Sequence, residues 1–255
     1  MSGAATRAEL RDEFRTGARS MLFSTESIDA FLETAPLSSI REVNDMLAHE
    51  REVRSRRKRE RLLRKARFPQ LKSMEDFDFS NIGFPEGYTK EHLQALGFIE
   101  EAQDFVFHGQ TGRGKTHLSE AVGILAVNAG FEVRFFTAAQ LVMALRRAAD
   151  GNRLDVVLKD ISRADLLIID ELGYVPLDIE GARLLFQVLS DAYERQSMVI
   201  TTNIEFSKWG TVFGDEKMAS AVIDRIVHHG RLVEFGGPSR RMDEALMLSG
   251  AREMV

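Results

Sequence analysis

The sequence predicts an α/β fold in which a parallel sheet is flanked by helices and preceded by a small, all-helical N-terminal domain. From residue 104 to residue 235, short apolar runs alternate with amphipathic helical stretches, a pattern typical of a parallel sheet covered on both faces. Before residue 72, apolar residues recur only at helical spacing. A glycine-rich loop between the first apolar run and the next helical stretch fits the same order of strand, loop and helix.

The N-terminal domain, residues 1–72, is expected to consist of helices with a basic second half. Apolar residues at helical spacing predict two short helices, around residues 10–22 and 28–32. After a break at Pro36, Ser39 and the Glu three positions later have the form of a capping box. We therefore expect a long helix that begins at Ser39 and runs to about residue 68, where a proline stops it.

Residues 73–255 are expected to form the α/β domain, which begins with a linker rich in Phe, Asp and Ser. The expected strands are residues 104–107, 132–136, 165–169, 198–201 and 231–235. One expected helix ends at residue 129, two pieces share residues 137–162, and two further helices cover residues 180–194 and 216–229. Gly130 and Gly230 are expected to close the helices that precede them.

The absence of cysteine and of long apolar runs excludes several classes of protein. No Cys occurs among the 255 residues, so a disulfide scaffold, a thiolate nucleophile and Cys-based zinc or iron-sulfur sites are excluded. No apolar run reaches the roughly 18 residues that a membrane span needs, and residues 1–17 mix Arg, Glu and Asp where a signal peptide is hydrophobic. We therefore expect a cytoplasmic protein with no membrane partner.

The formal net charge of −5 hides a strong asymmetry along the chain. Residues 51–72 contain eleven Lys or Arg and only two Glu. A solvated basic face is the simple alternative, but so few acids among so many cations favour contact with nucleic acid. Phosphate contacts of this kind give affinity without sequence specificity. The candidate DNA-binding residues in this segment are Arg54, Arg56, Arg57, Lys58, Arg59, Arg61, Arg64, Lys65 and Arg67.

The glycine-rich loop satisfies the P-loop pattern in full. Its glycines let backbone N–H groups curl around phosphate oxygens, and the helix N-terminus that follows favours an anion. Lys115 is expected to reach the β and γ phosphates, and the Thr116 hydroxyl is expected to bind Mg²⁺. A turn without a ligand is disfavoured, because the loop stands between a predicted strand and a predicted helix. The loop residues are Gly109, Gln110, Thr111, Gly112, Arg113, Gly114, Lys115 and Thr116.

Two carboxylates end a buried strand of the predicted sheet. Asp170 and Glu171 follow the apolar run 166–169, at the edge where a parallel sheet binds its ligands. Asp170 would hold Mg²⁺ through water, and Glu171 would orient and deprotonate the attacking water. Adjacent Asp and Glu suit an ATPase, so hydrolysis is favoured over phosphoryl transfer to a small molecule. Asn203, after the next strand, would contact the γ phosphate and the water, unless it only turns the chain.

Several stretches of the sequence resemble one family, the AAA+ ATPases of the IstB type, which help insertion sequences to transpose and are close to the DnaC helicase loaders. The resemblance covers about residues 51–235. It is carried by FP at 68–69, MEDFDF at 74–79, the P-loop continued by HL at 117–118, VRF at 133–135 before TA at 137–138, DELGYVPLD at 170–178 and FSKWGTVFGD at 206–215. The last two stretches are the most specific.

The resemblance implies an ATPase, with ATP and Mg²⁺ as cofactors, that assembles as a homo-oligomeric ring or spiral on double-stranded DNA. It would deliver this DNA to a cognate, IstA-like transposase. His117, which continues the P-loop match, is implied in the nucleotide site. In AAA+ proteins an arginine from the neighbouring subunit completes the site, and Arg225 matches that position.

The resemblance also bears on the end of the domain and on an insertion within it. Only twenty residues follow residue 235, too few for the usual helical lid, so the AAA+ domain is expected to be lidless. The two helical pieces over residues 137–162 resemble the insertion that initiator-type AAA+ proteins turn towards DNA. Arg146 and Arg147 lie there and are further candidate DNA contacts.

Two other functions remain open on the sequence. One is a DnaC-like loader of a replicative helicase, which would act on single-stranded DNA. The other is a DNA-binding adaptor whose nucleotide is structural and is turned over negligibly. The set of Asp170, Glu171 and Asn203 argues against the adaptor. A helicase loader would carry an N-terminal helix that binds the helicase, and the first fifty residues neither identify nor exclude such a helix.

Overall fold

A computed structural model describes residues 6–239, which divide into two compact units after Glu60. The boundary lies inside one long helix, α3, so each unit is described by itself. The expected α/β fold with a mostly parallel sheet, flanking helices and an N-terminal helical region is confirmed. No helix within residues 6–239 is both long enough and apolar enough to cross a membrane. The division of the chain into a basic N-terminal domain, residues 1–72, and an ATPase domain, residues 73–255, stays a prediction.

The first unit contains α1 (Arg7–Ser20), α2 (Thr25–Thr34) and most of α3 (Leu37–Ala66). α1 begins with a capping box between Thr6 and Glu9. α3 begins at Leu37, so the expected cap at Ser39 is wrong: the Ile40 N–H already donates to the Pro36 carbonyl at 3.1 Å, which places Ser39 inside the first turn. The core of this unit is formed by Leu10, Phe14, Ala18, Ile28, Leu32, Ile40 and Leu47.

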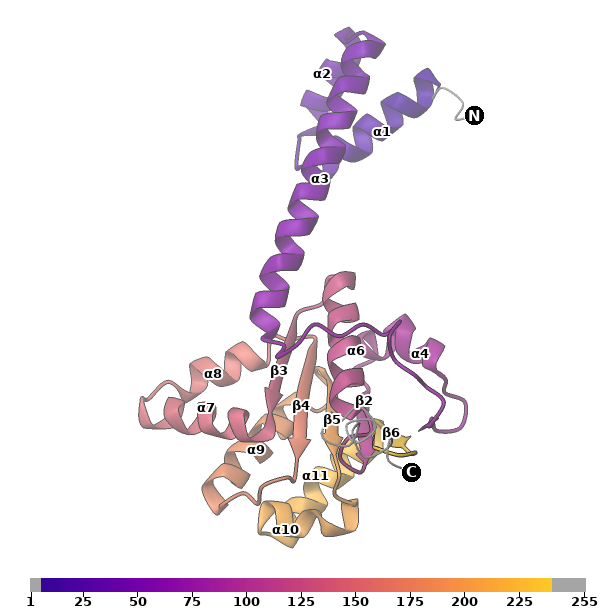
Figure 1. Cartoon of the computed structure of the whole chain (residues 1–255). Helices are drawn as coiled ribbons and strands as arrows, with labels where there is room; N and C mark the ends of the chain where they lie inside the picture. Colours follow the sequence, from indigo (N-terminus) through magenta and orange to yellow (C-terminus); the bar gives the residue numbers. More distant parts are fainter. Residues whose placement is uncertain (1–5, 240–255) are drawn as a thin grey trace, which may run out of the picture. The chain divides into compact units, whose positions relative to one another are not determined.

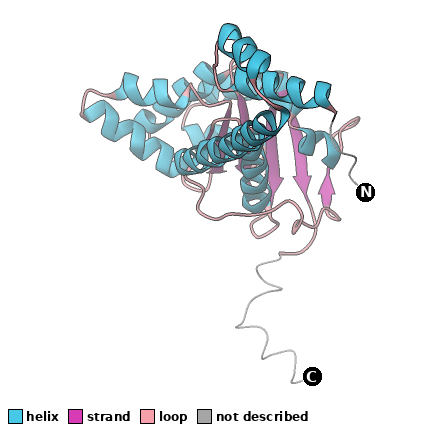
Figure 2. Cartoon of the chain, turned by 90° about the horizontal axis from the view of Figure 1, so that it is seen from above, coloured by secondary structure: helices cyan, strands magenta, loops and turns pink. Residues whose placement is uncertain are grey.

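The second unit is built on a six-stranded sheet in the order β1-β6-β2-β5-β4-β3. Figure 1 labels β2 to β6, and Figure 2 shows the strands with helices around them. Strands β2 to β6 pair in parallel, and only the short β1 is antiparallel, against β6. The strands are β1 (Ile82–Gly83), β2 (Asp104–Gly109), β3 (Val133–Thr137), β4 (Leu166–Leu172), β5 (Ser197–Thr202) and β6 (Gly230–Phe235). The five strands expected from the sequence are therefore present, each shifted or extended by a few residues.

Alternate residues of the strands point into two separate apolar cores. On one face, Phe105, Phe107 and Ile168 pack with α4 (Lys90–Ala95), α5 (Gly97–Glu100) and α6 (Lys115–Ala129). On the other face, Val106 and Ile169 pack with the remaining helices. These are α7 (Ala138–Asp150), α8 (Leu154–Ile161), α9 (Ile179–Ala192), α10 (Trp209–Phe213) and α11 (Glu216–His229), with the short 3₁₀ turn η1 (Phe206–Lys208) before α10.

The sequence missed the shortest elements. β1, α4, α5, η1 and α10 have between two and six residues, too few for a periodic pattern to identify. Gly130 closes α6 in a left-handed conformation, as expected. Gly230 follows the last residue of α11, as expected, but with an extended backbone, because it is also the first residue of β6. The expectation that no helical lid follows β6 concerns residues 240–255, which lie outside the described chain.

The last turn of α3 belongs to the second unit. Leu62 and Ala66 are buried in the same core as α6, and Phe68 packs edge-on against Phe135 with ring centroids 5.9 Å apart. Gly123 of α6 allows this approach, because a Cβ there would lie 2.6 Å from the Phe68 ring and 2.7 Å from Ile168. The chain that follows Phe68 is thereby held close to the N-terminal half of α6.

We expect Gly123→Val to destabilise the second unit by about 1–3 kcal/mol, because the added side chain overpacks the contact between α6 and Phe68. Chemical denaturation monitored by circular dichroism measures this loss. Gly97→Val is the matched control, since a Cβ at Gly97 meets no atom within 4 Å. Equal stability of the two variants would contradict the assigned role of Gly123.

Candidate nucleotide-binding site

The P-loop connects the end of β2 to the start of α6, as the sequence predicts. Gly109 leaves no room for a side chain, because a Cβ would lie 2.5 Å from the Phe235 carbonyl oxygen of β6. Gly114 has φ +92° and precedes the first helical residue, Lys115. Such positive φ values favour glycine. The loop therefore directs the first N–H groups of α6 into one concave surface, which suits a phosphate.

Lys115 is nearly buried, with 5% of its surface exposed. Its ammonium group donates to the carbonyl oxygens of Gly109 at 2.6 Å and Gln110 at 2.9 Å. The lysine thus lies across its own loop, at the place where phosphate oxygens would approach. His117, one turn into α6, contacts the Ser73 carbonyl oxygen through Nε2 at 3.1 Å and packs edge-on against Phe77. His117 therefore holds the linker that precedes the sheet.

Asp170 joins the P-loop helix to two strands. The Thr116 hydroxyl donates to its two carboxylate oxygens at 3.1 and 3.0 Å, and the Thr201 hydroxyl donates at 2.5 Å. Only 3% of Asp170 is exposed, and burial raises the pKa of its carboxyl, against the two hydroxyls and Lys115, which lower it. Hard cations prefer oxygen ligands of this kind, so the pair of Thr116 and Asp170 fits Mg²⁺. Thr201 was not identified from the sequence, since nothing in the pattern of β5 marks it.

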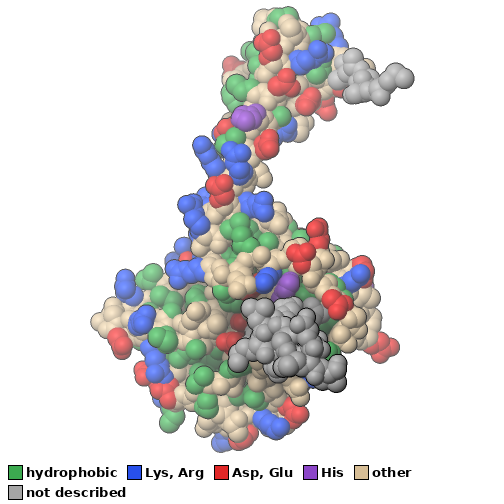
Figure 3. Space-filling model, in the orientation of Figure 1, with side chains coloured by type: hydrophobic (Ala, Val, Ile, Leu, Met, Phe, Trp, Pro, Cys, Tyr) green, Lys and Arg blue, Asp and Glu red, His purple; other side chains and the backbone are tan. Residues whose placement is uncertain are grey.

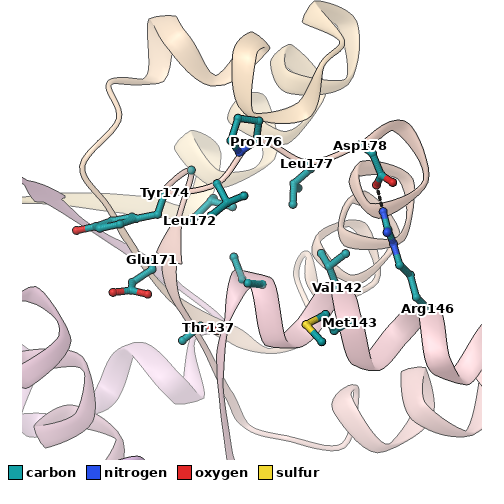
Figure 4. A pocket seen from close by; sticks show the side chains of 14 residues that line it. Thr137, Val142, Met143, Arg146, Glu171, Leu172, Tyr174, Pro176, Leu177 and Asp178 are labelled. Atoms are coloured by element: carbon teal, nitrogen blue, oxygen red, sulfur yellow. Dashed lines mark ion pairs between the residues drawn. The ribbon is translucent and has the colours of Figure 1, made fainter.

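Glu171 lies beside the P-loop cavity and not within it. Its backbone is left-handed, with φ +61°, at an irregularity in the pairing of β4 with β5. The Glu171 N–H donates to the Thr201 hydroxyl at 2.9 Å. The side chain lines a neighbouring cavity of about 310 Å³ with Thr137 and Tyr174, and Figure 4 shows it between these two residues. To reach a water near the phosphate, the Glu171 carboxylate must turn towards Asp170.

The P-loop cavity has a volume of about 420 Å³ and includes residues that the sequence did not identify. Gln70, Lys72 and Asp76 reach it from the linker after α3, Glu120 from α6 and Tyr174 from the loop after β4. Glu120 is 2% exposed, and burial together with the nearby Asp170 raises its pKa to about 7, against Lys72 and the Gln70 N–H, which lower it. No motif covers these residues, so only the fold reveals them.

Asn203 lines a third cavity, of about 410 Å³, together with Gln110 and Arg113. Its side-chain oxygen is buried and has no hydrogen-bond partner in residues 6–239. Arg113 donates to the Phe235 carbonyl oxygen at 3.1 Å and to the Gln110 side chain at 2.9 Å. Thr111 of the P-loop contacts the Tyr174 hydroxyl at 3.2 Å. Thr116 and Asp170 thus meet directly, next to Lys115, whereas Glu171 and Asn203 line two other cavities.

Arg225 is not part of this arrangement within one chain. Its guanidinium donates to the Ala221 carbonyl oxygen of α11 at 2.7 Å and lies 5.5 Å from the centre of the Phe186 ring. It lines none of the three cavities described above. If Arg225 contacts nucleotide, it does so at the site of another chain.

The candidate DNA-binding cations differ in their surroundings. All nine on or just after α3 are exposed, and Figure 3 shows the Lys and Arg side chains gathered along this helix. Arg54 pairs with Glu50 at 2.7 Å and Lys65 with Glu132 at 3.0 Å. Arg147 of α7 is exposed, whereas Arg146 pairs with Asp178 at the rim of the Glu171 cavity (Figure 4). Arg146 is therefore less available to a phosphate than Arg147.

The family described as IstB-like ATP binding protein matches residues 18–247. The chain is 38% identical over 199 residues to an insertion sequence IS21 ATP-binding protein of Pseudomonas aeruginosa, over 77% of this chain and 72% of the relative. It is 36% identical over 211 residues to an insertion sequence IS232 ATP-binding protein of Bacillus thuringiensis subsp. berliner, over 82% of this chain and 83% of the relative.

Solved structures share the fold at lower sequence identity. The DnaC helicase loader matches with a TM-score of 0.50 and 22% identity, over 58% of this chain and 89% of that chain. DnaI matches with a TM-score of 0.51 and 20% identity, over 67% of this chain and 90% of the DnaI chain. The replication initiator DnaA, bound to AMPPCP and single-stranded DNA, matches with a TM-score of 0.53 and 19% identity. The match covers 73% of this chain and 56% of the DnaA chain. The expected P-loop AAA+ fold is thereby confirmed.

We expect Thr201→Val to raise the Mg²⁺ concentration needed for half-maximal ATP binding by about tenfold or more, because Asp170 loses the hydroxyl that orients it. A magnesium titration of fluorescent ATP binding measures this shift. Thr211→Val is the control, since the exposed Thr211 hydroxyl donates only to the Lys208 carbonyl oxygen. An unchanged magnesium requirement in folded Thr201→Val protein would show that Thr201 does not orient the carboxylate.

Proposed function

The chain belongs to the family of IstB-like ATP-binding proteins, and from this premise we propose that it is an ATP-hydrolysing helper of an insertion-sequence transposase. In this proposal it oligomerises on double-stranded DNA and supplies that DNA to the transposase. The observation that carries the proposal is the direct contact of Thr116 with Asp170 beside Lys115, with a second carboxylate, Glu171, at the next position. This set is the one that ATP hydrolysis needs.

Each residue of the set has a distinct part in hydrolysis. Lys115 and the first N–H groups of α6 bind the phosphate oxygens and neutralise their charge. Thr116 and Asp170 would hold Mg²⁺, which supplies positive charge at the β and γ phosphates. Glu171, once turned from its cavity, orients the attacking water and accepts its proton. The buried amide oxygen of Asn203, which lacks a partner in the described chain, is available to position the same water.

The position of Arg225 supports assembly of several chains. Since its guanidinium lies away from the three cavities of its own chain, a role at the phosphates requires a neighbouring subunit. We propose that Arg225 stabilises the transferring phosphate of that neighbour. Bound ATP would then hold two subunits together, and hydrolysis would loosen their contact. A homo-oligomeric ring or spiral is the arrangement that repeats this contact.

The exposed cations of α3 support DNA as the surface on which the protein assembles. Seven of the nine candidates form no ion pair in residues 6–239, so their charges are available to phosphates. Contacts of this kind do not read a sequence, which suits a helper that does not choose a DNA site. Arg147 adds a cation on α7. The transposase partner and a cytoplasmic location rest on the family and on the sequence pattern.

We expect Glu171→Gln protein to form large complexes with ATP on a long DNA duplex, because loss of the base traps the ATP-bound state. Mass-resolved sizing on duplex and on single-stranded DNA of equal length, with and without ATP, measures this assembly. Glu171→Gln combined with Lys115→Ala is the control that lacks the phosphate contact. Assembly on single strands alone would instead favour a helicase loader, and assembly independent of ATP would favour an adaptor with a structural nucleotide.

We expect an equal mixture of Arg225→Ala and Lys115→Ala proteins to recover about a quarter of wild-type ATP hydrolysis on DNA, although each variant alone is inactive. In mixed oligomers, some intact P-loops of Arg225→Ala chains face an intact Arg225 of Lys115→Ala chains. A phosphate-release assay on mixtures of varied ratio measures the recovery. If no ratio restores hydrolysis, Arg225 does not act across a subunit contact.

A further inference from the structure

The linker between α3 and β1 contributes a second lysine to the P-loop cavity. Lys72 lines this cavity together with Lys115, Thr116 and Glu120. It belongs to none of the motifs that identify the nucleotide site, and it follows the nine candidate DNA contacts. Lys72 is half-buried and forms no ion pair within residues 6–239. A half-buried lysine that forms no ion pair within residues 6–239, and that lines the same cavity as the P-loop lysine, requires an explanation.

The backbone on both sides of Lys72 is held against α6. Before it, Gln70 lines the same cavity as Glu120 of α6, and its N–H lowers the pKa of the Glu120 carboxyl. After it, the Ser73 carbonyl oxygen contacts His117 Nε2 at 3.1 Å, and Phe77 is buried against the His117 ring. These contacts fix the linker across the first two turns of α6. The Lys72 side chain is thereby directed into the cavity by the fold.

Lys72 lines the same cavity as Thr116 and the buried Glu120. Its positive charge acts on Glu120, and the negative charge of Asp170 acts on the same carboxyl. Asp170 in turn accepts from Thr116, the residue expected to hold Mg²⁺ beside the β and γ phosphates. Lys115 and the expected Mg²⁺ together would still leave part of the negative charge of a triphosphate and the buried Asp170 unbalanced. A second ammonium group in this cavity would stabilise the terminal phosphate.

We propose that Lys72 is a second phosphate-binding lysine of this site, which contacts the terminal phosphate of a bound nucleoside triphosphate from the same chain. This inference rests on the proposed nucleotide site. It adds to that site a residue that distinguishes a triphosphate from a diphosphate.

The test compares the affinities for ATP and ADP, with Mg²⁺, in the Glu171→Gln background, where ATP is not consumed. Competition against a fluorescent nucleotide measures both dissociation constants. We expect Lys72→Met to weaken ATP binding by about tenfold or more and ADP binding by less than about threefold. The ratio of the two constants is the readout, because partial unfolding lowers both affinities equally. Lys217→Met, on the exposed face of α11, is the control and should leave the ratio unchanged.

The outcomes separate this inference from the proposed function. If the background protein binds ATP with Mg²⁺ and Lys72→Met keeps the same preference for ATP, the role of Lys72 is overturned and the nucleotide site stands. A Lys72→Met protein that loses ATP and ADP affinity to the same extent likewise overturns a contact with the terminal phosphate. If the background protein binds neither nucleotide, the proposed function and this inference both fail.

Discussion

The buried carboxylate of Asp170 is the constraint on which the arrangement of the site depends. It stands at the end of β4 and accepts hydrogen bonds from Thr116 of α6 and Thr201 of β5. A buried charge is unfavourable unless hydrogen bonds or a cation compensate it. The two hydroxyls compensate in part, and burial still raises the pKa of the carboxyl. A divalent cation beside Thr116 would complete the compensation, which is why nucleotide and magnesium are expected to bind together.

The parallel sheet explains why the chemistry gathers at one edge. β2, β5 and β4 are neighbours, and their carboxyl ends carry the P-loop, Asn203 and the pair of Asp170 and Glu171. Loops at these ends surround three adjoining cavities. The linker after α3 lines one of them through Lys72. Arg225 lies on α11, outside all three, which is why the proposed function assigns it to the site of a neighbouring subunit.

The family and the structure bear on different parts of the function. Membership among IstB-like ATP-binding proteins concerns the nucleotide, and the contacts of Thr116, Asp170 and Lys115 explain how this chain would hold it. Assembly on DNA is proposed from the exposed cations of α3, a physical argument about charge and phosphate. The long helix carries these cations, and the linker that follows it enters the nucleotide cavity. If Lys72 contacts the phosphate, α3 and the linker after it would connect DNA binding with nucleotide binding in one continuous segment of the chain.

The sequence by itself determined the α/β class, the positions of the five longer strands along the chain, the P-loop and the acidic end of β4, because periodicity and motif spacing are local properties. It misjudged the start of α3, where the Pro36 carbonyl accepts the first helical bond, and it missed the shortest elements. Only the tertiary structure brought Thr201, Glu120 and Lys72 to the site. Their positions depend on strand pairing and on how the linker packs over α6, which are contacts between distant residues that no local pattern records.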